Sequence, residues 1–339
     1  MDYLKLKGSH YEIGKLLGKF LKSNFREFKI KLNNEQYEYG IKSLNILNET
    51  FPEVIEEIKA VTEEIDFDYK LFGAWLMCMG SCLTIRENHN VEIRGCTAFA
   101  VIDDEKVYYG RNNDLPPYLK EVSKTITYDI TNKHKFTMNT SSFINGEEGI
   151  NEHGLVVAMT FVMPYKSEVC PGINSVFLVR YLLEQCNCVN SALNELKKVK
   201  ISSSCNILLV DKNKEMIVVE CSPFGINIQY PEKNIKNNNF IVTVNHFTTK
   251  EMQKYDRSNQ NIYSSKKRYQ NAYEALKNFK NENSKLYIKD ILKGKYGFMC
   301  QYKRIKFGTI WSTIFDIESE KMYLSDGNPE IIEYKEIIL

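Results

Sequence analysis

The sequence predicts an α+β protein built as a four-layer sandwich, in which helices cover the outer faces of two stacked sheets. Three observations support this fold class. Residues 9 to about 85 repeat apolar side chains at helical spacing, residues 96–161 have strand patterns, and two helices are then followed by further strands and helices. Blocks of helices and strands in this order pack as layers around shared cores. The pattern alone is equally compatible with another α+β sandwich.

Four helices are expected in the first part of the chain. The first has an apolar stripe on which Gly14 and Gly18 lie four residues apart, which favours close packing against another helix. The other three are expected over 34–47, 52–65 and 69–83, and the last is apolar nearly all round, so it should be buried. Residues 86–92 are polar and irregular, which is typical of an exposed linker.

The rest of the chain combines strands with helices. Asn145-Gly146 predicts a tight hairpin turn, because both residues tolerate a positive φ. Helices are expected over 175–185, 190–199, 263–279 and 288–292. Strands are expected over 96–101, 107–111, 122–130, 135–144, 155–161, 206–210, 216–220, 226–229, 240–244, 308–315 and 321–324, and one more strand should begin near 148.

The composition is that of an ordinary globular protein and argues against several classes of partner. Of 339 residues, 43% are hydrophobic and 26% are charged, and the formal net charge is +2. With no strong basic excess, nucleic acid and anionic membranes are not expected partners. No apolar run of signal-peptide length follows Met1, and no stretch approaches the roughly 20 apolar residues of a membrane helix. We therefore expect a cytoplasmic protein.

The nine cysteines and five histidines show no metal-binding spacing. In the cytoplasm the cysteines would mostly be reduced thiols. The close pair Cys186 and Cys188 is expected to be two ordinary residues at a helix end rather than a redox or metal site. The sequence therefore implies no metal and no cofactor.

The first predicted hairpin contains a candidate reaction centre. Cys96 begins one strand, while Arg111 and Asp114 end the next. Antiparallel pairing brings these ends together, so a thiol, a guanidinium and a carboxylate meet at one edge of a sheet. Gly95 allows backbone strain and a close approach that a side chain would block. The alternative for Cys96 is an ordinary buried cysteine at the start of a strand.

The same residues carry a family resemblance. Gly95-Cys96-Thr97, followed by Gly110-Arg111-Asn112-x-Asp114, resembles the N-terminal-nucleophile hydrolases of the choloylglycine hydrolase, acid ceramidase and penicillin acyltransferase group. The long region before the cysteine is more similar to the penicillin acyltransferase branch. The resemblance implies one domain, an αββα sandwich of two antiparallel sheets with an N-terminal helical segment. It also implies cleavage between Gly95 and Cys96, which would divide the chain into a helical segment, 1–95, and a catalytic segment, 96–339.

In this family the nucleophilic cysteine supplies its own base. The α-amine of a mature N-terminal Cys96 would have a pKa of about 7.7–8.0, so it could take the thiol proton near neutral pH. Before cleavage, attack of the thiol on the Gly95 carbonyl would give an N-to-S acyl shift, which water completes. Asp114 is expected to orient the new ammonium group, with a turn cap as its alternative role. Arg111 is expected to stabilise the thiolate or hold substrate, with a salt bridge to Asp114 as the alternative.

The resemblance also points to residues far along the chain. Asn245 is similar to the asparagine whose amide contributes to the oxyanion hole, a donor worth about 3–4 kcal/mol. Thr160 and Phe161 stand near the second oxyanion asparagine of the bile-salt branch, which this sequence lacks, so a backbone N–H near Thr160 is the expected replacement. Ser265 and Arg268 match a serine-rich turn followed by an arginine that locks the site. The alternative for Arg268 is the charged face of a solvated helix.

The expected function is that of an autoprocessing cysteine amidohydrolase or acyltransferase, which acts on a linear non-peptide amide through a Cys96 thioester. The expected partner is a small N-acyl amide, with acyl-CoA as a further donor class and homo-oligomerisation left open. Two alternatives remain. One is a conventional thiol hydrolase with a Cys96–His246 dyad, and the other is an inactive binding module on the same fold.

Overall fold

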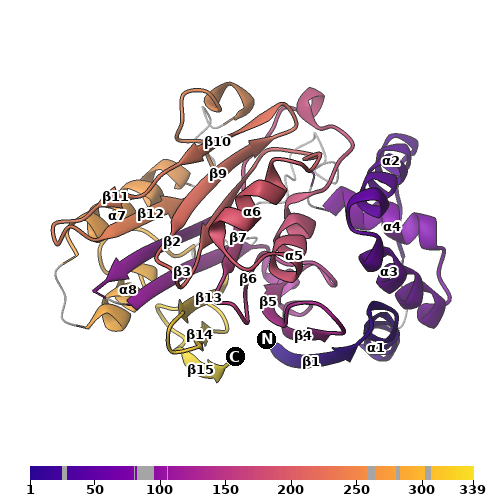
Figure 1. The fold of residues 1–339 in the computed structure, drawn as a ribbon, viewed down its shortest axis with the longest axis horizontal. Coiled ribbons are helices and arrows are strands. Elements are labelled where there is room, and N and C mark those ends of the chain that lie inside the picture. The colour runs from indigo at the N-terminus through magenta and orange to yellow at the C-terminus, as the bar shows by residue number, and fades with distance from the viewer. Residues whose placement is uncertain are drawn as a thin grey trace.

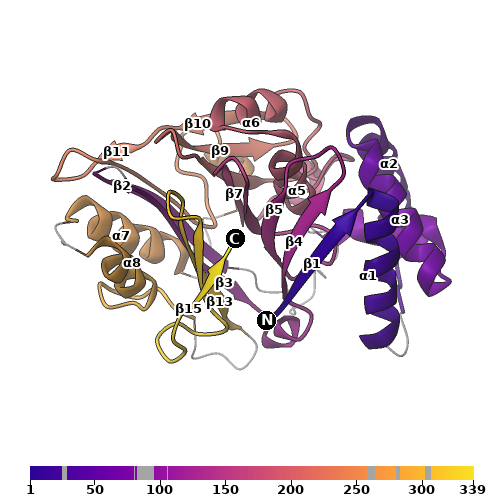
Figure 2. The same cartoon turned by 60° about the horizontal axis from the view of Figure 1, so that its bottom comes forward.

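The computed structural model describes residues 1–24, 29–79, 81, 95–104, 106–257, 264–279, 283–301 and 307–339. Two sheets lie face to face, and helices cover both outer faces (Figure 1 and Figure 2). The expected four-layer α+β sandwich is therefore confirmed. The predicted linker over 86–92 lies outside the described residues. None of the helices in the described part of the chain combines the length and apolar character needed to cross a lipid bilayer.

The first sheet has eight strands in the order β1-β4-β5-β6-β7-β8-β9-β10. All neighbours are antiparallel except β1, which pairs in parallel with β4 at the edge. This one parallel pair is an addition to the expected antiparallel sheets, and β1 itself was not predicted. The strands are Asp2–Gly8 (β1), Lys124–Ile130 (β4), Phe136–Thr140 (β5), Glu148–Asn151 (β6), Val156–Phe161 (β7), Cys205–Val210 (β8), Met216–Ser222 (β9) and Gly225–Gln229 (β10).

The second sheet has seven strands in the order β11-β12-β2-β3-β13-β14-β15, all paired antiparallel. The predicted hairpin forms its middle. The strands are Gly95–Asp103 (β2), Lys106–Leu115 (β3), Glu232–Lys233 (β11), Asn239–Thr243 (β12), Gly308–Asp316 (β13), Lys321–Ser325 (β14) and Lys335–Ile338 (β15).

Small side chains let the two sheets approach each other. Ala98 and Ala100 of β2 belong to one buried cluster with Ala158 of β7. In the same cluster the rings of Tyr109 and Phe315 stack with centroids 5.4 Å apart. This layer fixes the position of β2, and therefore of Cys96, relative to the first sheet.

The helices divide into two groups. Those that share a core with the first sheet are α1 (His10–Asn24), α2 (Asn34–Thr50), α3 (Pro52–Ile65), α4 (Tyr69–Met79), α5 (Ser175–Gln185) and α6 (Val189–Leu196). The second sheet is covered by α7 (Ser265–Lys277) and α8 (Ser284–Leu292). Short 3-10 turns occupy Pro117–Lys120, Lys166–Glu168 and Gln253–Tyr255. Both views place α1–α4 at the end of the molecule opposite to α7 and α8.

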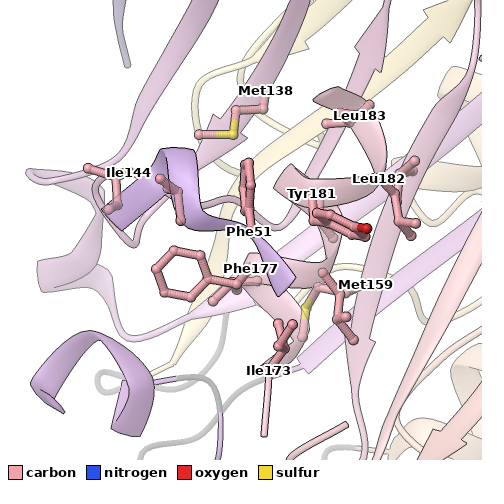
Figure 3. Packing of buried hydrophobic residues seen from close by; sticks show 14 of the residues in the cluster. Phe51, Met138, Ile144, Met159, Ile173, Phe177, Tyr181, Leu182 and Leu183 are labelled. Carbon is pink, nitrogen blue, oxygen red and sulfur yellow. The ribbon is translucent and has the colours of Figure 1, made fainter. Parts of the chain in front are cut away.

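The helices that precede Cys96 are part of the main core. Phe51, between α2 and α3, is completely buried and meets Tyr181 of α5 edge-on, with ring centroids 5.4 Å apart. Figure 3 shows it among Phe177, Tyr181 and other apolar side chains of the cluster. The predicted close packing at Gly14 is confirmed, because a Cβ there would lie 2.4 Å from the Glu57 carbonyl oxygen of α3.

A buried ionic cluster joins α1 and α3 to α5. Arg180 donates to both carboxylate oxygens of Glu57, at 2.7 and 2.5 Å. The two ring nitrogens of His10 lie 3.1 Å from Glu57 Oε2 and 2.8 Å from Glu184 Oε1. Although burial lowers the pKa of His10, its hydrogen bonds to the two carboxylates raise that pKa above its ordinary value. The cluster therefore links residues on both sides of the Gly95–Cys96 bond.

The predicted turn at Asn145-Gly146 is wrong. Strand β5 ends at Thr140, and the reversal instead places Phe143 at a φ of +67°, inside the isolated bridge between Ser142 and Asn145. Close packing surrounds Gly146 instead, because a Cβ there would lie 2.8 Å from the sulfur of Met138. An Asn-Gly pair favours positive φ, but tertiary packing decides here where the chain turns.

Candidate active site

The hairpin places the predicted residues together. In its register Cys96 faces Asn113, Gly95 faces Asp114 and Ala98 faces Arg111. Cys96 is 3% exposed. A Cβ on Gly95 would lie 2.9 Å from the ring of Phe307 and 3.2 Å from the Asp114 Cβ, so the expected close approach is present. The φ of Gly95 is not in the left-handed region, so the expected backbone strain is absent there.

The thiol of Cys96 lies against an arginine and an amide. Its Sγ is 3.3 Å from Asn113 Oδ1, and Arg111 Nη2 donates to the sulfur at 3.0 Å. The same Arg111 nitrogen donates to Asn113 Oδ1 at 2.6 Å. Arg111 is anchored by carbonyl oxygens, that of Met159 at 2.5 Å and that of Glu147 at 3.3 Å. Of its described contacts none is a salt bridge to Asp114, so that alternative is wrong.

The backbone of Cys96 is held by two side chains from other elements. Its N–H donates to Asn245 Oδ1 at 2.7 Å, and its carbonyl oxygen accepts from Arg268 at 2.5 Å. Arg268 also donates to Asn245 Oδ1 at 2.8 Å. The Cys96 N–H and the Arg268 guanidinium can only donate hydrogen bonds, so the Asn245 side-chain atom between them must be the oxygen. The Asn245 amide nitrogen donates to the Phe161 carbonyl at 2.8 Å.

Arg268 is completely buried, so its alternative role on a solvated helix face is wrong. It lies on the first turns of α7 and donates also to Thr97 Oγ1 at 2.7 Å. One guanidinium therefore bridges strand β2 and Asn245, which lies two residues after the end of β12.

Asp114 is buried, and one of its two carboxylate oxygens accepts a hydrogen bond. Thr309 donates to Oδ1 at 2.6 Å, whereas Oδ2 is buried and has no hydrogen-bond partner among the described residues. Burial raises the pKa of Asp114 to about 6, even though the charge of Arg268 acts to lower it. The carboxyl lies opposite Gly95, beside the peptide bond whose cleavage is expected.

The remaining predicted residues contact Asn245 and its chain neighbours rather than the thiol itself. Thr160 donates to the Val244 carbonyl at 2.5 Å, which ties β7 to the end of β12. Ser265 Oγ accepts from the Asn245 N–H at 3.0 Å and lies 2.8 Å from His246 Nδ1. Burial, together with the charge of Arg268, lowers the pKa of His246 to about 4.

The intact chain keeps the thiol in its neutral form. Burial raises the pKa of Cys96, although the charge of Arg111 acts in the opposite direction. Only the thiolate is a good nucleophile, so this thiol needs a base before it can react.

Sequence reasoning missed two residues of the site, namely Asn113 and Thr309, and gave Thr97 a place in the motif but no role. Asn113 lies inside the Arg111-to-Asp114 motif, and the hairpin register alone would have placed it opposite Cys96. Thr309 pairs with Asp114 in the β3–β13 register, which has no local sequence signal.

The comparison with solved structures finds distant similarities. No curated protein sequence matches the chain. Three solved structures are similar: penicillin V acylase from Agrobacterium tumefaciens, an N-acylethanolamine-hydrolyzing acid amidase ortholog from Caenorhabditis elegans, and a variant of conjugated bile acid hydrolase from Clostridium perfringens. Their identities are 16%, 15% and 13%, and their TM-scores are 0.45, 0.49 and 0.47. The similarities cover 68%, 72% and 72% of this chain and 83%, 100% and 92% of theirs.

The family assignment rests on a sequence match that spans most of the chain. Residues 101–330 match the family described as acyl-coenzyme A:6-aminopenicillanic acid acyl-transferase. The matched range includes Arg111, Asp114, Asn245 and Arg268 and begins shortly after Cys96. The chain therefore belongs to the acyl-coenzyme A:6-aminopenicillanic acid acyl-transferase family.

Proposed function

We propose that the protein is an autoprocessing cysteine amidohydrolase or acyltransferase that acts on a small N-acyl amide through a Cys96 thioester. The observation that carries this proposal is the set of side chains that bind the thiol and the backbone of Cys96. The thiol is held by Arg111, and the backbone on either side of it is held by Asn245 and Arg268. An ordinary core cysteine does not need three charged or amide side chains from separate elements around it.

Cleavage between Gly95 and Cys96 would create the base that the thiol lacks. In the intact chain the Cys96 nitrogen is a peptide N–H that donates to Asn245. As an α-amine it would have a pKa near 8 and could accept the thiol proton. The thiolate then attacks the substrate carbonyl, and the leaving amine takes the proton as the thioester forms. Water or a second amine attacks the thioester and releases the acyl group.

Asp114 and Asn245 have roles that follow from their unused hydrogen-bonding capacity. Asp114 Oδ2, which has no hydrogen-bond partner in the described part of the chain, lies beside the expected cut, so a new ammonium group would supply a partner and a counter-charge. The amide nitrogen of Asn245 has a second hydrogen besides the one given to Phe161, and we assign that hydrogen to the oxyanion.

We further propose that segments 1–95 and 96–339 remain together after cleavage within one domain, because they share the core around Phe51 and the ionic cluster around Glu57. The name of the family suggests acyl-CoA as a donor class for transfer. We retain the cytoplasm as the proposed compartment, since the eight described cysteines are all free.

The contacts of His246 do not favour a Cys96–His246 dyad. The hydrogen bonds described for the thiol go to Asn113 and Arg111, whereas the imidazole binds Ser265. A His246→Ala variant that loses all activity while still being cleaved would nevertheless support the dyad.

Intact mass and acylation of the purified full chain test the proposal. The wild type should yield two fragments separated between Gly95 and Cys96, and the processed protein should hydrolyse members of a panel of N-acyl amides, with acyl-CoA donors tested for transfer. Cys96→Ala should stay intact, inactive and unlabelled by an acylating probe, whereas Cys186→Ala, at another buried cysteine, should behave as wild type. Full activity of the intact chain would contradict the processing step. Equal labelling of Cys96→Ala and wild type would favour the inactive binding module.

A further inference from the structure

We propose a binding site for a divalent transition metal ion, of the zinc class, formed by His134, Glu152 and His153. His134 lies in the turn between β4 and β5, and the other two residues lie in the turn between β6 and β7. Phe136 of β5 faces Asn151 of β6, so pairing brings both turns to the same end of the first sheet. The sequence spacing conceals the site, because His134 and His153 are far apart along the chain.

The three ligand atoms have the separations that one bound ion requires. His134 Nδ1 and His153 Nε2 are 2.9 Å apart, and Glu152 Oε1 lies 3.6 Å from the first and 4.0 Å from the second. A triangle with these sides has a centre about 2.1 Å from every corner, which equals the usual zinc–nitrogen and zinc–oxygen distances. The three ligand atoms are therefore close enough for one ion to contact all of them, and the ion would replace the hydrogen bond that joins the two rings.

The turn that carries two of the ligands is held in place by hydrogen bonds within it and to neighbouring segments. Asn151 Oδ1 accepts from the His153 N–H at 3.1 Å, and its Nδ2 donates to the Leu183 carbonyl at 2.9 Å. The Lys135 N–H donates to Glu152 Oε1 at 3.1 Å, and the Lys135 carbonyl accepts from the Glu152 N–H at 2.8 Å. Such outer contacts orient the ligands and raise metal affinity.

The type of ligand indicates which ions bind. Two imidazole nitrogens and one carboxylate oxygen suit Zn²⁺ and its neighbours, whereas Mg²⁺ and Ca²⁺ prefer oxygen ligands alone. The side chains of His134, His153 and Glu152 are 30%, 38% and 46% exposed, so an ion can enter from solvent and water can complete its coordination.

The site is separate from the candidate active site. The Phe161 carbonyl, which binds Asn245, lies at one end of β7, and the turn with Glu152 and His153 precedes the other end. Six strand residues span roughly 20 Å. The ion would therefore join two turns of the first sheet rather than take part in acyl transfer, and the inference does not depend on the proposed function.

Titration calorimetry of the metal-free full chain with Zn²⁺ tests the inference. We use Cys96→Ala as the background, because a reactive thiol is a competing zinc ligand. One ion per chain should bind. His134→Ala and His153→Ala should each weaken binding by at least about 100-fold. Loss of a residue that only contacts a ligand weakens metal binding by about 10- to 100-fold, and loss of the ligand itself should cost at least as much. Lys135→Ala, which removes a neighbouring charge and no proposed ligand atom, should bind as the background does.

Two further measurements keep the result interpretable. Without metal, the melting temperatures of the histidine variants should match the background, and Zn²⁺ should raise the melting temperature of the background alone. The visible spectrum with Co²⁺ should show nitrogen and oxygen ligation without a thiolate charge-transfer band. A thiolate band, or unchanged affinity in the His134→Ala/His153→Ala double variant, would overturn the site.

Discussion

Replacing Asp114 by Asn should stabilise the uncleaved protein. Burial raises the pKa of this carboxyl from 3.8 to about 6. A carboxyl with a raised pKa binds its proton more tightly in the folded chain than in the unfolded chain. The free energy of unfolding therefore falls as the pH rises from about 4 to about 6, and it stays lower at higher pH. Each pKa unit corresponds to about 1.4 kcal/mol, so the full effect is about 3 kcal/mol.

The substitution isolates the charge. Asn keeps an oxygen that can accept the 2.6 Å hydrogen bond from Thr309. The Oδ2 position is unpartnered among the described residues, so a buried acceptor oxygen without a partner is exchanged for a buried NH2 group that also lacks one there. A Cys96→Ala background prevents cleavage, so that both proteins are compared as intact chains. The same variant in the wild-type background should be inactive, because the ammonium group would lose its counter-charge.

Urea unfolding at pH 4 and at pH 7.5 measures the effect. Asp114→Asn should change the free energy of unfolding little at pH 4 and should raise it by about 3 kcal/mol at pH 7.5. Asp129→Asn, at a carboxylate with a 45% exposed side chain that pairs with Lys7, should change it by less than about 1 kcal/mol at either pH. A difference that does not vary with pH, or a loss of stability at pH 7.5, would refute the reasoning.

Three other substitutions test separate parts of the structure. Arg180→Met removes the partner of a buried carboxylate and should lower the free energy of unfolding by about 3–5 kcal/mol. Lys198→Met, at an exposed ion pair, should lower it by at most about 1 kcal/mol. Equal losses for the two variants in denaturant unfolding would contradict this reasoning. Gly95→Ala places a Cβ against a buried ring and should slow cleavage; an unchanged time course by mass spectrometry would count against the close approach. Asn113→Leu removes the amide beside the thiol and should lower kcat about 10- to 100-fold with less effect on KM; steady-state kinetics showing only a KM change would assign this residue to substrate binding.

The sequence predicted those elements whose position is set by residues close together in the chain. The β2–β3 hairpin was predictable because alternation and a polar turn fix its register, and that register places Arg111 and Asp114 near Cys96. Burial of Arg268 was not predictable from its own segment, since two lysines precede it and the helix exposes them. Only the family resemblance selected it, and the structure shows it turned into the core.

The features that the sequence did not reveal depend on distant contacts. Strand β1 was missed because only Leu6 in it is buried, and its parallel partner β4 lies far along the chain. Arg180 looked like an ordinary helix residue, but its charge is balanced by Glu57 of a helix more than a hundred residues earlier. His134 and His153 meet only because β5 and β6 are paired.

Strand β1 has a consequence for how the protein can be produced. It is paired with β4 along all seven of its residues, and α1–α3 contribute to the core beneath the same sheet. A gene truncated to start at Cys96 would leave β4 as an open sheet edge above an uncovered apolar face, a combination that promotes aggregation. Recombinant work on this chain should therefore begin at Met1, or co-express the first 95 residues as a separate polypeptide.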